Sequence, residues 1–199
     1  MRIENSGLTT PAIFLDRDGT LIEEAGYLDR LERISVFPWT IDALRVLGRA
    51  GFKLIVVSNQ AGVAKGMFDE AFVRETHKVL TDRFAAGGAR IDGFYYCPHF
   101  QEGSVEAYRL ACECRKPKPG MLHRAAREHD LDLGRSFVVG DRWSDVEAAQ
   151  AAGARGVLVK TGYGVIDAAH PKAGVEAARI AETLMDATTF ILQEPRRCA

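Results

Sequence analysis

The chain has 199 residues, 47% of them hydrophobic, which suits a single domain (residues 1–199) with a substantial core. Its 26 basic and 27 acidic side chains give a net charge of −1, and this argues against a broad nucleic-acid or membrane surface, because either needs basic excess. No hydrophobic run reaches the length of a membrane span, and residues 1–11 lack the pattern of a signal peptide, so the expected location is cytoplasmic.

The first half of the chain alternates predicted strands with predicted helices. Ala12–Leu15 is a short hydrophobic run, typical of a parallel strand that is buried on both faces. A predicted helix follows and stops before Gly51. Leu54–Val57 repeats the strand pattern, and Asp69 then caps a helix that is predicted to extend to Phe84.

The second half continues this alternation. The further predicted strands are Gly93–Cys97, Ser136–Val139 and Gly156–Val159. The predicted helices are Gly120–Glu128, a helix opened by the capping box Ser144-x-x-Glu147 and stopped at Gly153, and Val175–Leu192, before a loose end at Gln193–Ala199. The alternation predicts an α/β protein in three layers, with a Rossmann-like, doubly wound parallel sheet.

Four polar groups follow the carboxyl ends of predicted strands or lie beside them, where open parallel sheets bind their ligands. The four groups are Asp16–Thr20, Ser58–Gln60, Arg115–Pro117, and Gly140–Asp141 with Asp145. Asp16 and Asp18 are two residues apart on an extended strand end, so they point to the same side and repel each other unless a cation lies between them. With Asp141 they offer Mg²⁺ the oxygen ligands it prefers, while Lys116 offers a positive charge to a phosphoryl group.

Three cysteines and one histidine occur close together, as Cys97-x-His99 and Cys112-x-Cys114. Three thiolates and one imidazole fill a tetrahedral zinc shell and leave no open position, which predicts a structural Zn²⁺. The alternative is that buried cysteines occur together by coincidence. Zinc would fasten the loop 97–114 beside Arg115 and Lys116, which follow it directly.

Four segments of the sequence resemble motifs of the haloacid dehalogenase (HAD) superfamily of aspartate-based phosphatases. They are FLDRDGT (14–20), VVSNQ (56–60), CRKPKPGM (114–121) and VVGDRWSD (138–145). The resemblance implies the HAD fold, and the short gaps after the first two motifs leave no room for a large cap domain. The chain is therefore expected to be a magnesium-dependent phosphatase with a small zinc-binding loop.

The resemblance also implies a role for individual residues. Asp16 would be the nucleophile that forms an aspartyl-phosphate, and Asp18 would be the general acid and base. Ser58 and Lys116 would hold the phosphoryl oxygens. Asp16, the main-chain carbonyl of Asp18, and Asp141 would bind Mg²⁺.

The cysteine and histidine cluster resembles that of a zinc-containing branch of the superfamily, whose substrates include a heptose 1,7-bisphosphate and histidinol phosphate. The segment Gln60–Gly66 and the long zinc loop resemble those of the members of this branch that act on the heptose, which implies hydrolysis of the 7-phosphate of the heptose bisphosphate. Histidinol phosphate is the alternative, and a non-catalytic phosphate-binding regulator is a third hypothesis. The expected partner is a phosphorylated sugar, without nucleic acid or membrane, and the expected state is a monomer.

Several residues are expected to contact the substrate. Among them, Arg115 is expected to bind, in a bidentate manner, the phosphate that is not hydrolysed. They are Arg17, Glu24, Ala25, Gly26, Tyr27, Ser58, Asn59, Gln60, Ala61, Arg115 and Lys116. Two positions depart from the branch's pattern: Ala61 stands where Ser is common, and Arg142 stands where Lys is common.

Overall fold

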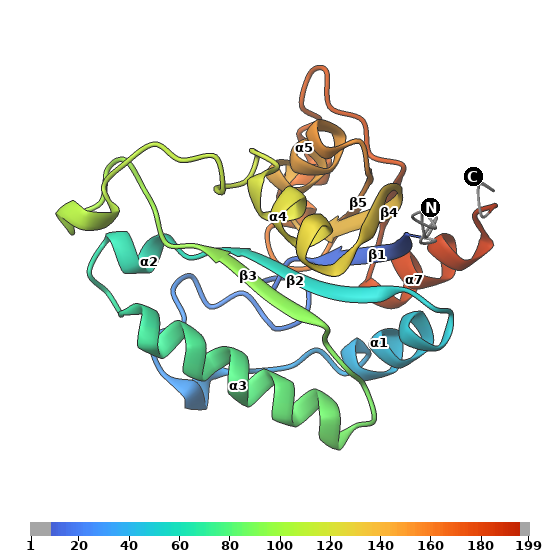
Figure 1. Cartoon of the computed structure of the whole chain (residues 1–199), viewed down its shortest axis with the longest axis horizontal. Coiled ribbons are helices and arrows are strands. Elements are labelled where there is room, and N and C mark those ends of the chain that lie inside the picture. Colours follow the sequence, from blue (N-terminus) through green and yellow to red (C-terminus); the bar gives the residue numbers. More distant parts are fainter. Residues whose placement is uncertain (1–8, 196–199) are drawn as a thin grey trace, which may run out of the picture.

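The computed structural model describes residues 9–195, in which six parallel strands form one sheet between helices (Figure 1). The strands are β1 (Thr10–Leu15), β2 (Lys53–Asn59), β3 (Gly93–Cys97), β4 (Leu131–Gly140), β5 (Arg155–Val159) and β6 (Arg179–Ala181). Their order in the sheet is β3-β2-β1-β4-β5-β6. The chain therefore winds outward from β1 in one direction and from β4 in the other, and a crevice is expected where these two strands end.

Helices cover both faces of the sheet, which confirms the three layers expected from the sequence (Figure 1). The helices are α1 (Thr40–Arg49), α2 (Ala61–Ala64), α3 (Glu70–Ala86), α4 (Gly120–His129), α5 (Trp143–Ala152), α6 (Gly164–Ala169) and α7 (Leu184–Gln193). Helices α1, α3 and α7 pack on one face, and α4 and α5 pack on the other. Within residues 9–195, every helix is too short or too polar to reach across a lipid bilayer.

The central strand β1 shows how the sequence divides its hydrophobic side chains between the two layers. Ile13 and Leu15 belong to the hydrophobic cluster with α1, α3 and α7, whereas Ala12 and Phe14 belong to the cluster with α4 and α5. All four are fully buried. This alternation follows from the two-residue period of a strand, and it explains why the strand is hydrophobic at every position from Ala12 to Leu15.

The prediction of one helix over Val175–Leu192 is wrong. Residues Arg179–Ala181 pair instead with β5 and form the edge strand β6, and α7 begins only after Thr183. The Thr183 hydroxyl accepts a hydrogen bond from the Asp186 N–H, and the Asp186 carboxylate accepts one from the Thr183 N–H. This reciprocal capping fixes the helix start at Thr183.

The chain end predicted to be loose begins within α7. Gln193 is the last residue of α7, and the Glu194 carboxylate lies 2.6 Å from the Arg155 guanidinium. Residues 196–199, which complete the predicted loose segment, lie outside the described residues.

The capping box predicted at Ser144-x-x-Glu147 is also wrong. The N-cap of helix α5 is Arg142 and its first residue is Trp143, two residues earlier than predicted, and the Asp145 carboxylate accepts a hydrogen bond from the Arg142 N–H at 3.1 Å. The predicted stop at Gly153 is confirmed, because Gly153 adopts the left-handed conformation with φ of 76°.

His77 on α3 is buried against β3 and gives a pH-dependent contribution to stability. Its ring stacks on Phe94 with 4.6 Å between centroids. Burial, with a smaller contribution from Arg17, lowers the pKa of His77 from 6.5 to about 3. Between these two pH values, His77 is protonated in the unfolded chain but neutral in the folded protein. The stability that is present above the pKa of the unfolded chain is therefore lost as the pH falls.

We therefore expect His77→Phe to stabilise the protein, relative to wild type, by roughly 2 kcal/mol more at about pH 5 than at about pH 7.5. Urea unfolding of both proteins at the two pH values measures this difference. Acid effects on other groups are common to both proteins and cancel in the comparison. An identical stability difference at both pH values would contradict the prediction.

Candidate active site

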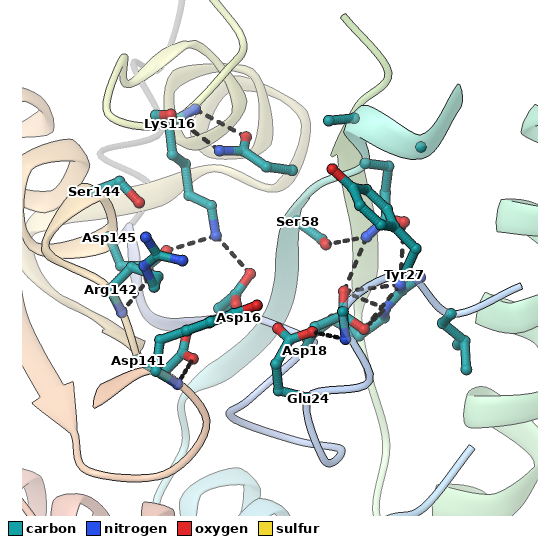
Figure 2. A pocket seen from close by; sticks show the side chains of 18 of the residues that line it. Asp16, Asp18, Glu24, Tyr27, Ser58, Lys116, Asp141, Arg142, Ser144 and Asp145 are labelled. Carbon is teal, nitrogen blue, oxygen red and sulfur yellow. Dashed lines mark hydrogen bonds and ion pairs between the residues drawn. The ribbon is translucent and has the colours of Figure 1, made fainter. Parts of the chain in front are cut away.

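A cavity of about 380 Å³ opens at the carboxyl ends of β1, β2 and β4 (Figure 2). It lies at the switch point of the sheet, where the strand order predicts a binding crevice. The lining residues that the sequence analysis singled out are Asp16, Arg17, Asp18, Glu24, Gly26, Tyr27, Ser58, Asn59, Gln60, Ala61, Arg115, Lys116, Asp141, Arg142 and Asp145. The structure thus brings together all four polar groups that follow or flank strands in the sequence.

Lys116 lies between two buried carboxylates at the base of this cavity (Figure 2). Its Nζ is 2.6 Å from Asp16 Oδ1 and 2.5 Å from Asp145 Oδ1. Burial alone would lower the pKa of Lys116, but the charges of Asp145 and Asp16 outweigh burial and raise it. Lys116 is therefore a fixed positive charge beside the Asp16 carboxylate.

The position of Lys116 is set by the end of β2. The Asn59 side chain donates a hydrogen bond to the Lys116 carbonyl and accepts one from the Lys116 N–H, each at 3.0 Å. In addition, Lys116 Nζ donates to the carbonyl of Val57 at 2.8 Å. These three bonds hold a loop residue against the end of β2.

Asp16, Asp141 and Asp145 form a second feature of the site, a group of carboxylates whose oxygens lie within 4.8 Å of one another. Burial raises the pKa of Asp141, and the charges of Asp16 and Asp145 raise it further. Burial likewise raises the pKa of Asp16; Lys116 opposes this shift, and Asp145 and Asp18 add to it. Crowded oxygen ligands of one charge are suited to hold a divalent cation such as Mg²⁺.

Gly19 makes room for the Asp141 carboxylate. It adopts a φ of 78°, and a Cβ added there would lie 2.2 Å from Asp141 Oδ2. The other side of Asp141 is fixed by the Tyr163 N–H, which donates to Oδ2 at 2.7 Å. Glycine is therefore required at position 19 both by the backbone conformation and by the approach of this carboxylate.

Asp18 lies on the other side of Asp16 and is held by a polar network. Its carboxylate accepts hydrogen bonds from the Arg17 guanidinium at 3.0–3.1 Å and from Gln60 Nε2 at 3.0 Å. Gln60 Nε2 also contacts Ser58 Oγ at 2.6 Å. Arg17, Ser58 and Gln60 are buried, so the network fixes the orientation of the Asp18 carboxylate.

The rim of the cavity contains most, but not all, of the expected contact residues. Ala25 does not line the cavity; its carbonyl accepts a hydrogen bond from Arg33 at 3.0 Å. The sequence analysis did not assign the other lining residues, which are Leu28, Gly62, Phe68, Ser144 and Tyr163. Tyr163 follows β5 after a short loop, so the rule that ligands bind at carboxyl strand ends could have found it.

The cysteine and histidine cluster lies at the end of β3, in the loop that leads to Arg115. The sulfur of Cys114 is 3.2 Å from that of Cys97 and 3.3 Å from both the Cys112 sulfur and His99 Nδ1. The ligand atoms on a tetrahedral zinc ion, with Zn–S bonds of about 2.3 Å, lie roughly 3.7 Å apart. The four donors are thus nearly in the arrangement that zinc requires.

Comparison with known proteins identifies sequence relatives along most of the chain. A family model described as HAD-hydrolase-like matches residues 113–187. A D-glycero-beta-D-manno-heptose-1,7-bisphosphate 7-phosphatase of Rhodopseudomonas palustris is 48% identical over 73% of this chain and 81% of its own length. The enzyme of the same name from Escherichia coli K12 is 44% identical over 77% of this chain and 81% of its own length.

A solved structure agrees with these relatives. It is a D,D-heptose 1,7-bisphosphate phosphatase from B. bronchiseptica complexed with magnesium and phosphate, and it is 32% identical to this chain. The two structures superpose with a TM-score of 0.82, over 93% of this chain and 99% of the other.

Proposed function

This chain belongs to the HAD-like hydrolases, in the family of its heptose-bisphosphate phosphatase relatives, and we propose that it hydrolyses the 7-phosphate of D-glycero-D-manno-heptose 1,7-bisphosphate. The observation that carries the proposal is the buried pair of Asp16 and Lys116, whose side chains are 2.6 Å apart at the base of an open cavity. A carboxylate nucleophile beside a fixed cation is what transfer of a phosphoryl group to a carboxylate needs.

In the first step of the proposed reaction, an Asp16 carboxylate oxygen attacks phosphorus, and the bond from phosphorus to the sugar oxygen breaks. Asp18 gives its proton to that leaving oxygen. In the second step, Asp18 takes a proton from water, whose oxygen attacks the aspartyl-phosphate. Inorganic phosphate and the free Asp16 carboxylate result. Lys116 and Ser58 hold the phosphoryl oxygens in both steps.

A divalent metal is part of this chemistry in the family, and the residues present suit Mg²⁺. Asp16, Asp141 and the main-chain carbonyl of Asp18 would hold the ion, which neutralises charge on the phosphoryl group when bound. The crowded carboxylates support this assignment, because their mutual repulsion is relieved by a cation.

The donors Cys97, His99, Cys112 and Cys114 would hold Zn²⁺ in a structural role. We expect wild-type protein to carry one zinc per chain and Cys112→Ser to lose most of it, because three donors bind zinc far more weakly than four. Activity should fall with the zinc, since Cys114 directly precedes Arg115 and Lys116. Metal analysis and phosphate release measure the two effects.

Cys198→Ser is the matched control for this variant, because Cys198 lies far along the chain from the cluster. It should keep both zinc and activity. Full zinc content in Cys112→Ser would contradict the proposed ligand set.

The competing substrate is histidinol phosphate, and a panel that contains it and the heptose bisphosphate separates the two assignments. We expect kcat/KM for the heptose bisphosphate to exceed that for histidinol phosphate at least about a hundredfold, since only the bisphosphate has a second anionic group for Arg115. Faster hydrolysis of histidinol phosphate would overturn the assignment. The monomeric state and the cytoplasmic location stay predictions.

A further inference from the structure

Four side chains from three loops form a row beside the cavity: Tyr27, Lys65, Phe100 and Arg115, here called the cationic wall. Phe100 and Arg115 share the loop between β3 and α4, and Tyr27 and Arg115 line the cavity. Lys65 Nζ donates a hydrogen bond to the Tyr27 hydroxyl at 2.7 Å and lies 5.0 Å from the centroid of the Phe100 ring. The Arg115 guanidinium carbon lies 5.1 Å from the same centroid. Phe100 therefore connects two cations from different parts of the chain.

Lys65 and Arg115, the two cations of the cationic wall, differ from the other cations near the cavity because neither is paired with a carboxylate of the described part of the chain. Arg17, Lys116 and Arg142 each pair with a carboxylate. Within residues 9–195, no carboxylate lies within 4.0 Å of Lys65 or Arg115. Their polar partners are uncharged: the Tyr27 hydroxyl for Lys65 and the His99 carbonyl, at 3.4 Å, for Arg115. Both cations therefore remain available to an anion.

The position of Phe100 relative to Lys65 is fixed by the main chain. The Val105 N–H donates to the Ala64 carbonyl at 2.8 Å, and the Ser104 hydroxyl donates to the Lys65 carbonyl at 2.9 Å. These bonds join the loop after β3 to the end of α2 and the residue that follows it, and Figure 1 shows this loop beside α2. These hydrogen bonds fix the loop that contains Phe100. Its ring therefore has a defined position and can hold the two cations in place by cation–π contacts.

Arg115 is already expected to bind the non-reacting phosphate of the substrate. We propose that Lys65 binds the same phosphate beside Arg115 and that Phe100 is the positioning residue that holds both cations for it. The proposal rests on the proposed function, because it requires a substrate with two phosphates. Arg115 supplies two parallel donors and Lys65 a compact charge, which together match the two negative charges of a phosphate monoester. Lys116 and Asp16 at the base of the cavity engage the other phosphate.

The test of Lys65 compares two substrates, the heptose 1,7-bisphosphate and the heptose 7-phosphate that lacks the second phosphate. Lys65→Met should raise KM for the bisphosphate at least about tenfold, the effect of losing one charged hydrogen bond, with little change in kcat. KM for the monophosphate should not change. The matched control is Lys78→Met, which removes the same charge from an exposed site on α3 and should change neither value.

The test of Phe100 uses two variants. Phe100→Leu should raise KM for the bisphosphate about tenfold, because both cations lose the ring, whereas Phe100→Tyr should restore the wild-type value. Zinc content, measured in parallel, should equal that of wild type in both. An equal loss on both substrates, or a loss that follows zinc content, would indicate a merely structural role and overturn the proposal.

The outcomes also separate this proposal from the proposed function. If wild-type protein does not hydrolyse the heptose bisphosphate, the proposed function fails, and the same variants are compared on fructose 1,6-bisphosphate and fructose 6-phosphate. A bisphosphate-selective rise in KM there would support the cationic wall on its own. If the KM of wild-type protein is no lower for either bisphosphate than for the corresponding monophosphate, the proposal about the cationic wall fails as well.

Discussion

Asp16→Asn should reduce kcat for the heptose bisphosphate by at least about 10⁴-fold, because an amide cannot serve as the carboxylate nucleophile. The variant should still fold. Asn has nearly the same shape as Asp, and Asp145 remains as a counter-charge for Lys116. Phosphate release under saturating substrate and Mg²⁺ measures the loss, and thermal unfolding checks the fold.

Asp82→Asn is a matched control, since it makes the same chemical change at an exposed helix position paired with Lys78. It should leave kcat unchanged. An unchanged kcat in Asp16→Asn would contradict the aspartyl-phosphate mechanism. If wild type were equally inactive and still bound phosphate, the non-catalytic regulator would be the better hypothesis.

Lys116→Met should affect both stability and activity. Lys116 and its partners Asp16 and Asp145 are all buried, and removal of the cation leaves two carboxylates without their counter-charge. We expect a loss of about 3–5 kcal/mol in the free energy of unfolding without added Mg²⁺. We also expect a drop in kcat of about 10²–10³-fold, because the phosphoryl oxygens lose their cation.

Urea unfolding and phosphate release measure these two effects. Lys118→Met is the control: Lys118 is two residues further along and pairs with the exposed Glu113, so its loss should cost less than about 1 kcal/mol. Added Mg²⁺ should recover part of the stability of Lys116→Met, since it supplies positive charge to the same carboxylates. A Lys116→Met protein as stable as wild type would show that the buried charges are compensated elsewhere.

The sequence predicted the central strands and most of the site for a physical reason. Strands buried on both faces are hydrophobic at every position, so the polar residues that follow them, such as Asp16 and Asp141, are conspicuous. The edge strand β6 was not predicted because it is only three residues long, and its Arg179 and Ile180 are exposed. Such a strand has no hydrophobic pattern to recognise.

The contacts within the site were less predictable than its location. From the sequence, Asp145 was only one member of the polar group that contains Asp141, whereas in the structure its carboxylate pairs directly with Lys116. That contact depends on the orientation of a loop that Asn59 fixes from another strand. Pairings of this kind depend on three-dimensional positions, which spacing along the chain does not encode.

The crowding of Asp16, Asp141 and Asp145 has a consequence for the proposed metal site. Since burial raises the pKa values of Asp16 and Asp141, these carboxyl groups retain protons more readily than exposed ones do. Binding of a cation would therefore be an exchange that displaces protons into the solvent. The apparent affinity for the cation should rise with pH, so mild acidification should weaken its binding.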